Sequence, residues 1–458
     1  MTAESDNPAW IYDDLPAEVN TSLLTPRLGR ACAELLAPEG LWRLRKVDRL
    51  VLGERTEGRR RLSVDLIAPS MDQLRYGEGA ITQLLIPVTM LRKEPLRDFD
   101  FEIEGRAAPV LSRFDNASLA TAAVMATFET AEGNLEGSSG LIKAVWALIV
   151  GRPEEARELL KGLRQSGEYD GDKVVDPSLI SDQSLSLLDR LCENYLLVGV
   201  APESIASRRI LVKYSFHWDV QSDAGRPSLL TRIATAAGYR DGFLQIETSA
   251  PFEAASYHLE VKLPDDLQSS LLAVLLKVDE AVSSGPDEVV SDTQLTQVAH
   301  LEGRLDERHD GIARMAVRVP TPGLRTVAGL VCLFLFLFCL GDRLLPHGHP
   351  ALVAAGGGGG ALLLGVPAAV LAMQARPGES AMTNMFVQPL RWVILGAAAC
   401  LFVCATTVVG DLHHPWVDVW WWTVLAASGA ATIFLGLGSV VSGRVHDVGT
   451  RTDGGHNG

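Results

Sequence analysis

Hydrophobic and polar positions divide the chain into two parts with different patterns. From Thr326 onward, long apolar stretches contain almost no charge, whereas the preceding residues mix apolar and polar positions as soluble proteins do. A helix needs about 20 apolar residues to cross roughly 30 Å of hydrocarbon, so the stretches predict membrane-spanning helices. Their predicted limits are about 326–345, 351–373, 392–410 and 416–441.

Alternation with a period of two predicts strands in the soluble part. It is clearest from Ile210 to Val220 and recurs at 257–263 and 313–319. With further strands expected at 243–248 and 271–278, the pattern favours a β-sandwich over residues 206–320. Earlier in the chain, a hairpin is expected over 47–68, followed by strands at 83–91 and 99–104.

A helical region is predicted between these two sets of strands. Apolar periodicity and helix-start signals place helices at 116–130, 141–150, 153–164 and 178–200. Two layouts fit. Either an N-terminal α+β region, 1–205, precedes a separate sandwich-like region, 206–320, or one β domain carries a helical insertion. We favour the first, because the second region has enough strands of its own.

The predicted fold class is therefore an α+β soluble head including a β-sandwich, followed by a C-terminal four-helix transmembrane bundle. The transmembrane region occupies residues 321–445, and residues 446–458 are expected to form a disordered tail. The Pro-containing linker at 320–323 is short, so it either couples the head to the first span or acts as a passive tether.

Basic residues near the spans predict the orientation, because Lys and Arg concentrate in cytoplasmic loops. One side of the four crossings collects Arg314, Arg318, Arg325, Arg376, Arg391, Arg444 and Arg451, and the other side has Arg343 alone. Met1–Trp10 lacks the pattern of a signal peptide. We therefore expect a multi-pass protein of the inner (plasma) membrane with a cytoplasmic head and both termini cytoplasmic. Cys32 and Cys192, the two cysteines of the head, fit a reducing compartment.

The acidic balance argues against nucleic acid as a partner. The net charge is −15, and six Arg residues balance six acidic residues after Pro320, so the excess negative charge lies in the head. Nucleic-acid binding requires a basic face that neutralises phosphates.

One basic cluster stands out against this background: Arg43, Arg45, Lys46, Arg59, Arg60 and Arg61. It is a candidate surface for the anionic inner leaflet, where each basic group contributes up to about 1 kcal/mol. The alternative is a solvated face of the predicted hairpin.

The candidate metal site lies in the predicted outer loops and comprises His347, His349, His413 and His414. Imidazoles near acidic residues suit zinc or a related divalent ion, and their protonation would equally report external pH. The alternative is ordinary polar loop histidines, since the spacing matches no defined site.

No phosphate-binding loop, dinucleotide fingerprint, zinc-protease motif or nucleophile elbow occurs in the chain, so neither an enzyme nor a cofactor is expected. The Gly-rich spans would allow helices to approach closely and the chain to self-associate. The leading hypothesis is a non-enzymatic sensor, scaffold or recruiting platform whose head binds a cytoplasmic protein or small ligand. The alternative is a membrane-permeabilising effector or transport accessory built from the four spans.

Four short segments carry a resemblance: Arg59–Asp65 (RRRLSVD), Asp98–Phe101 (DFDF), Arg106–Arg113 (RAAPVLSR) and Ser256–Val261 (SYHLEV). Ahead of membrane spans, they resemble uncharacterised four-span membrane proteins of actinobacteria with a large N-terminal soluble head. The richness in Ala, Gly and Arg is similar to that of a high-GC source. The resemblance implies the architecture and carries no activity or site residues.

Overall fold

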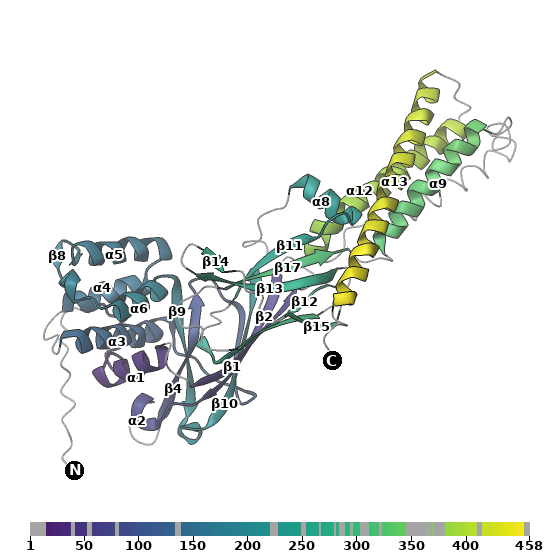
Figure 1. The fold of residues 1–458 in the computed structure, drawn as a ribbon. Helices are drawn as coiled ribbons and strands as arrows, with labels where there is room; N and C mark the ends of the chain where they lie inside the picture. Colours follow the sequence, from purple (N-terminus) through teal and green to yellow (C-terminus); the bar gives the residue numbers. More distant parts are fainter. Residues whose placement is uncertain are drawn as a thin grey trace, which may run out of the picture.

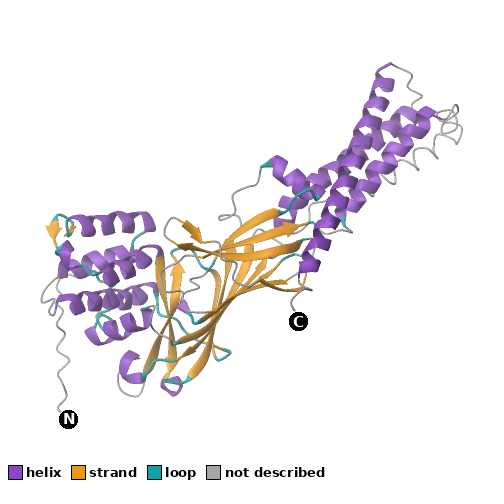
Figure 2. Cartoon of the chain, viewed as in Figure 1, coloured by secondary structure: helices purple, strands orange, loops and turns teal. Residues whose placement is uncertain are grey.

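The computed structural model describes most of the head and three long apolar helices. The described residues are 15–37, 42–52, 57–77, 82–132, 139–219, 228–248, 253–264, 267–278, 281–283, 289–293, 296–302, 311–319, 323–344, 365, 369, 381–409 and 415–452. Strands occupy the middle of the molecule, between a group of short helices at one end and the long apolar helices at the other (Figure 2).

The largest sheet has eight strands in the order β15-β16-β12-β1-β2-β10-β5-β6. Their bounds are Arg43–Leu52 (β1), Glu57–Ile67 (β2), Arg97–Ile103 (β5), Arg106–Ala107 (β6), Arg209–Asp219 (β10), Ser256–Lys262 (β12), Val289–Thr293 (β15) and Thr296–Glu302 (β16). β1 and β2 form the predicted hairpin, and β1 pairs in parallel with β12, with Lys46 opposite Tyr257.

This sheet contains strands from both of the predicted regions, 1–205 and 206–320. β10 and β12, which were predicted to belong to a separate sandwich, are neighbours of β2 and β1. The described strands therefore do not form a separate sandwich over residues 206–320. The alternative layout, in which one β region carries a helical insertion, is closer, because most helices of the head come between β6 and β10, two strands of the same sheet.

A three-stranded sheet and a helical layer lie at the end of the head far from the long apolar helices (Figure 1). The sheet joins β3 (Arg75–Tyr76), β4 (Gln83–Arg92) and β9 (Asn194–Pro202). The layer contains α1 (Pro26–Leu36), α2 (Met71–Leu74), α3 (Arg113–Glu132), α4 (Ser139–Val150), α5 (Pro153–Gln165) and α6 (Asp182–Glu193), with the small hairpin β7–β8 (Glu168–Tyr169, Asp172–Lys173) and the 3₁₀ turns Pro177–Leu179 and Glu203–Ile205.

The helix predicted at 178–200 is only half correct, since β9 begins at Asn194. β9 pairs with β4, and helices cover one side of this sheet while the large sheet covers the other. A strand buried on both faces has a continuous apolar sequence, which periodicity cannot separate from a helix. Leu119, Leu148 and Val198 belong to the resulting hydrophobic core, which we call the distal core.

α1 and α3 cross closely within this layer. A Cβ on Gly29 would lie 2.2 Å from the carbonyl oxygen of Ala122, so only glycine fits at this crossing. α1 was not predicted from the sequence, although Thr25 caps its first turn and Pro26 follows at the first helical position.

A four-stranded sheet and a short helix lie between the large sheet and the long apolar helices. The strands are β11 (Gly242–Glu247), β17 (Gly311–Arg318), β13 (Gln268–Val278) and β14 (Ala281–Ser283), in that order. The helix is α8 (Leu229–Ala237), with Ser228 as its N-cap and Gly238 in the left-handed conformation (φ 85°) at its C-terminal end. Leu259, Met315 and Trp218 contribute to a second hydrophobic core, which we call the proximal core.

Among the described residues, three helices are long and apolar enough to cross a membrane: α9 (Leu324–Leu344), α12 (Ala381–Val409) and α13 (Pro415–Thr452). They correspond to three of the four predicted spans. Of the span predicted at 351–373, all residues except 365 and 369 lie outside the described residues. α13 continues to Thr452, well into the segment that was expected to be a disordered tail.

Candidate functional site: a buried polar layer and the membrane junction

A layer of charged side chains crosses the middle of the head, between the distal and proximal cores. Trp42, just before β1, belongs to the distal core, and Leu50 of β1 belongs to the proximal core. Lys46 and Asp48 lie between them with no exposed surface. We call this set the polar layer; its members are Arg43, Lys46, Asp48, Arg60, Thr89, Arg190, Glu253 and Tyr257.

Strand alternation explains how charged residues reach the interior. Lys46, Asp48 and Leu50 are two residues apart, so they share the inward face of β1, whereas Arg49 points outward and is exposed. The register of the β1–β2 pair shifts between Arg43 and Arg45. Such an irregularity breaks the alternation, and Arg43 is consequently buried at 4 % exposure.

The Asp48 carboxylate is held by two neighbours in the sheet. Arg60 of β2 donates to both of its oxygens, at 3.0 and 2.5 Å, and the Tyr257 hydroxyl of β12 donates to Oδ2 at 2.8 Å. Arg60 also donates to the carbonyl oxygen of Glu247 in β11 at 3.1 Å. This pair therefore links the large sheet to the four-stranded sheet.

The Glu253 carboxylate joins three other elements. It accepts hydrogen bonds from Lys46 Nζ of β1 at 3.2 Å, Thr89 Oγ1 of β4 at 2.6 Å and Arg190 Nη2 of α6 at 3.1 Å. Glu253 itself lies just before β12. Through Glu253, the segment that precedes β12 is thus bound to β1, to β4 and to α6 of the helical layer.

The polar layer holds four basic side chains but only two carboxylates. Burial alone would raise the pKa of Glu253, but Lys46, Arg43 and Arg190 lower it to about 2. Burial lowers the pKa of both Lys46 and Arg43, and the negative charge of Glu253 opposes that effect. Arg43 donates to the carbonyl oxygen of Pro87 at 3.0 Å, and its Nε has no hydrogen-bond partner among the described residues.

This arrangement is suited to holding elements of the head together. Each carboxylate is engaged by two or more donors, and Lys46 is fully buried against Glu253. Among the described residues, no group of three or more His, Cys, Asp or Glu side chains is placed to hold a metal ion. Removing one member of such a layer would leave an opposite charge buried without compensation, which is strongly destabilising.

The junction between the head and the long helices is apolar. Phe386 and Ile394 of α12 and Ala328 of α9 are buried in the proximal core together with Leu259 and Met315 of the strands. A Cβ on Gly242 would lie 2.3 Å from Cε1 of Phe386, which shows how closely β11 approaches α12. The spans and the head thus share one hydrophobic core.

α8 adds polar contacts to this junction. Arg325 of α9, only 1 % exposed, donates to the Ala237 carbonyl oxygen at the C-terminal end of α8, where a cation is favourable. A Cβ on Gly438 of α13 would lie 1.9 Å from the same oxygen. The Tyr239 hydroxyl donates to the carbonyl oxygen of Phe434 at 2.7 Å. α9 and α13 are therefore both docked against the end of α8.

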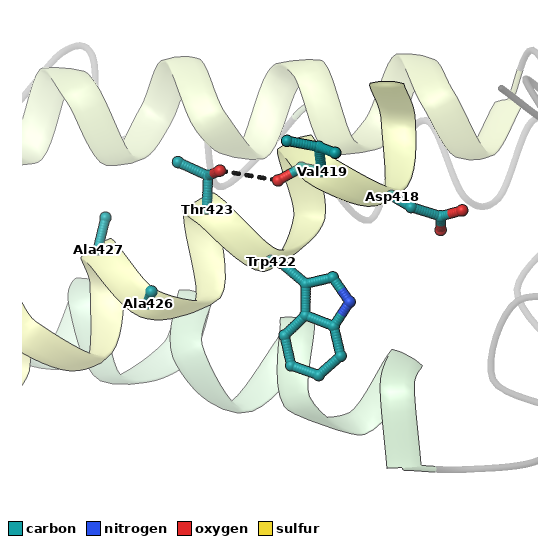
Figure 3. A pocket seen from close by; sticks show the side chains of 6 residues that line it. All are labelled: Asp418, Val419, Trp422, Thr423, Ala426 and Ala427. Carbon is teal, nitrogen blue, oxygen red and sulfur yellow. Dashed lines mark hydrogen bonds between the residues drawn. The ribbon is translucent and has the colours of Figure 1, made fainter. Parts of the chain in front are cut away.

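At the far end of the spans, a shallow hollow lies on α13 (Figure 3). Its lining includes Asp418, Trp422 and Thr423, and the Thr423 hydroxyl donates to its own helix, at the Val419 carbonyl oxygen. Arg343 of α9 pairs with Asp418 at 2.9 Å and lies 5.8 Å from the ring centre of Trp422. The polar residues in its lining are Asp418 and Thr423, and the apolar ones are Val419, Trp422, Ala426 and Ala427.

The structure divides the predicted basic surface between two faces of the large sheet. Arg43, Lys46 and Arg60 are buried in the polar layer, whereas Arg45 and Arg61 are exposed and Arg59 is half-buried. The three buried residues are not accessible to a lipid surface. The candidate metal ligands His347, His349, His413 and His414 lie outside the described residues.

The acidic half of the polar layer, Asp48 and Glu253, was not predicted from the sequence, and neither were Arg190 and Tyr257. One signal was present: Lys46 and Asp48 occupy the same alternation phase as Leu50 and Leu52, which are core positions. Charged residues at inward positions of a strand indicate a buried ionic pair. Glu253 gave no such signal, because its partners are distant in sequence.

No protein-family model matches the chain, and no curated protein matches it.

Proposed function

We propose that the chain is a multi-pass membrane protein whose cytoplasmic head works as a non-enzymatic sensor, scaffold or recruiting platform. One observation carries the proposal: Phe386, Ile394 and Ala328 of the long helices are buried in the same core as the strands of the head. Burying one large apolar side chain contributes about 1.5–3 kcal/mol, so separating the head from the spans would be costly. A passive tether needs no shared core.

The shared core gives the head a fixed position beside the membrane. α9 and α12 both begin in the proximal core, as a topology with four crossings requires. The distal helical layer is then the part of the head farthest from the lipid (Figure 1). α5, at one edge of this layer, exposes Glu154, Arg157, Glu158 and Lys161. This charged face is where we place recruitment of a cytoplasmic protein.

The cytoplasmic side follows from the bias of Arg residues. Arg314, Arg318 and Arg325 precede or open α9, and Arg391 lies in the first part of α12. Arg343 is the basic residue at the other end of α9, where it pairs with Asp418. The positive-inside rule places the head, with its larger number of basic flanking residues, in the cytoplasm.

Thiol labelling in cells tests the orientation. A cysteine at Glu158 on exposed α5 should react with a membrane-impermeant maleimide only after spheroplasts are permeabilised. A cysteine at Trp416, which is 74 % exposed at the far end of α13, is the matched control and should react in intact spheroplasts. The reverse labelling pattern would place the head outside and refute the proposed cytoplasmic platform.

A further inference from the structure

α8 has one apolar face that is only half covered by protein. Successive helical residues turn by about 100°, so Leu229, Leu230, Ile233, Ala236 and Ala237 fall on one side of the helix. The C-terminal part of this face is buried, with Ala236 at 1 % and Ala237 at 2 % exposure. The N-terminal part is open, with Leu229 at 67 %, Leu230 at 79 % and Ile233 at 36 % exposure.

Contacts with the spans fix the level of α8 along them. α8 contacts α12 and α13, and it lies beside the head-side ends of these helices (Figure 1). Arg232 donates to the side-chain oxygen of Gln388 in α12. Trp392, one turn further along α12, is 62 % exposed, and exposed Trp side chains are enriched where a bilayer meets water. α8 is therefore at the height of the membrane interface.

The neighbouring surface has the composition of an interface-binding region. Phe243 of β11 is 48 % exposed, and the guanidinium of Arg314 lies 4.2 Å from its ring centre. Arg240, exposed just beyond α8, donates to the Thr231 hydroxyl on the polar side of the helix. Aromatic and aliphatic groups bordered by Arg side chains suit the boundary between anionic headgroups and acyl chains.

We propose that α8 is an interfacial helix whose open apolar face, Leu229, Leu230 and Ile233, inserts into the lipid surface beside the spans. Such helices bury their apolar face about 5–10 Å into the boundary between headgroups and acyl chains. Lipid would then cover the N-terminal part of the apolar face, as protein covers Ala236 and Ala237 in its C-terminal part. α8 thus supports the head from the side, in addition to the shared core. This inference rests on the proposed membrane crossing of α9, α12 and α13, and it does not depend on which side the head occupies.

Photo-crosslinking of the full chain in liposomes of phosphatidylcholine and phosphatidylglycerol tests the proposal. The photoreactive residue p-benzoylphenylalanine replaces Leu230 in one variant. In the soluble-face control it replaces Leu211, an exposed residue at the distal end of β10. In the span control it replaces Phe402, a 61 % exposed residue of α12. Mass spectrometry then separates adducts with lipid, with a second copy and within the chain.

We expect the lipid adduct at Leu230 to exceed that at Leu211 several-fold and to approach that at Phe402. Crosslinks from Leu230 to a second copy or to another part of the chain, in place of lipid, would overturn the proposal. A lipid adduct at Phe402 without one at Leu230 would refute the interfacial helix alone. Absence of lipid adducts at both positions would refute the membrane crossing on which it rests.

Discussion

Two regions hold the molecule together through different interactions: charged hydrogen bonds in the polar layer and apolar packing at the membrane junction. At the polar layer, Asp48 and Glu253 hold β1, β2, β4, β12 and α6 together through charged hydrogen bonds. At the membrane junction, apolar side chains such as Phe386 pack against strands, and Gly242 and Gly438 permit close backbone approach. Both regions join parts that are far apart in sequence.

The difference lies in how each region responds when it is disturbed. A buried ion that loses its partner keeps its full desolvation cost, so breaking one contact of the polar layer should be strongly destabilising. The loss of apolar packing instead scales with the buried area and with the cavity that is left. The polar layer therefore depends on each charge keeping its partner, and the junction depends on the amount of apolar surface that is buried.

The largest expected effect is a difference in stability loss between breaking a buried ionic pair and breaking an exposed one in the same sheet. Asp48 pairs with Arg60, and Asp65 of the same hairpin pairs with Arg209 in a similar two-point contact at the surface. Asp48→Asn leaves Arg60 buried without a counter-charge and should lower the free energy of unfolding by about 3–5 kcal/mol. Asp65→Asn should cause a much smaller loss, because solvent screens the exposed pair.

Urea titration of the full chain in detergent micelles, followed by tryptophan fluorescence, measures both variants. Equal losses for Asp48→Asn and Asp65→Asn would show that burial of the polar layer has no special effect on stability.

The second effect is a loss of stability in acid. The pKa of Glu253 is about 2 in the folded protein, against an ordinary value of 4.5. A lowered pKa contributes stability that is complete above pH 4.5 and is lost as the pH falls towards 2. The shift corresponds to about 3 kcal/mol in total. Urea titrations at decreasing pH should show this loss, and Glu253→Gln should flatten the dependence in that window. Parallel curves for the two proteins would contradict the assignment.

The sequence predicted the parts of the fold that depend on local pattern. Alternation located β10, β12 and β17 within one or two residues, and apolar length identified α9, α12 and α13. It failed where a tertiary neighbour decides the outcome. Residues 194–202 form a strand because β4 pairs with them, and no local periodicity reports that pairing.

The candidate site was harder to predict than the fold. The cluster of basic residues is a true feature of the sequence, but the pleat of β1 and β2 sends Lys46 and Arg60 inward and Arg45 and Arg61 outward. The acidic partner of Lys46 was hidden, because Glu253 lies far along the chain and comes close through the parallel pairing of β12 with β1. Sheet order cannot be inferred from alternation alone.

The most direct test of the account is the distance between the head and the far end of the spans. Spin labels at Gln245, an exposed position of β11, and at Trp416 of α13 report whether the two parts move as one body. In liposomes, double electron–electron resonance should give one narrow distance distribution. Phe386→Ala, which empties part of the shared core, should broaden it, whereas Phe402→Ala on the exposed face of the same helix should not. A broad distribution in the unmodified core, or an identical response to the two substitutions, would contradict a head held rigidly to its spans.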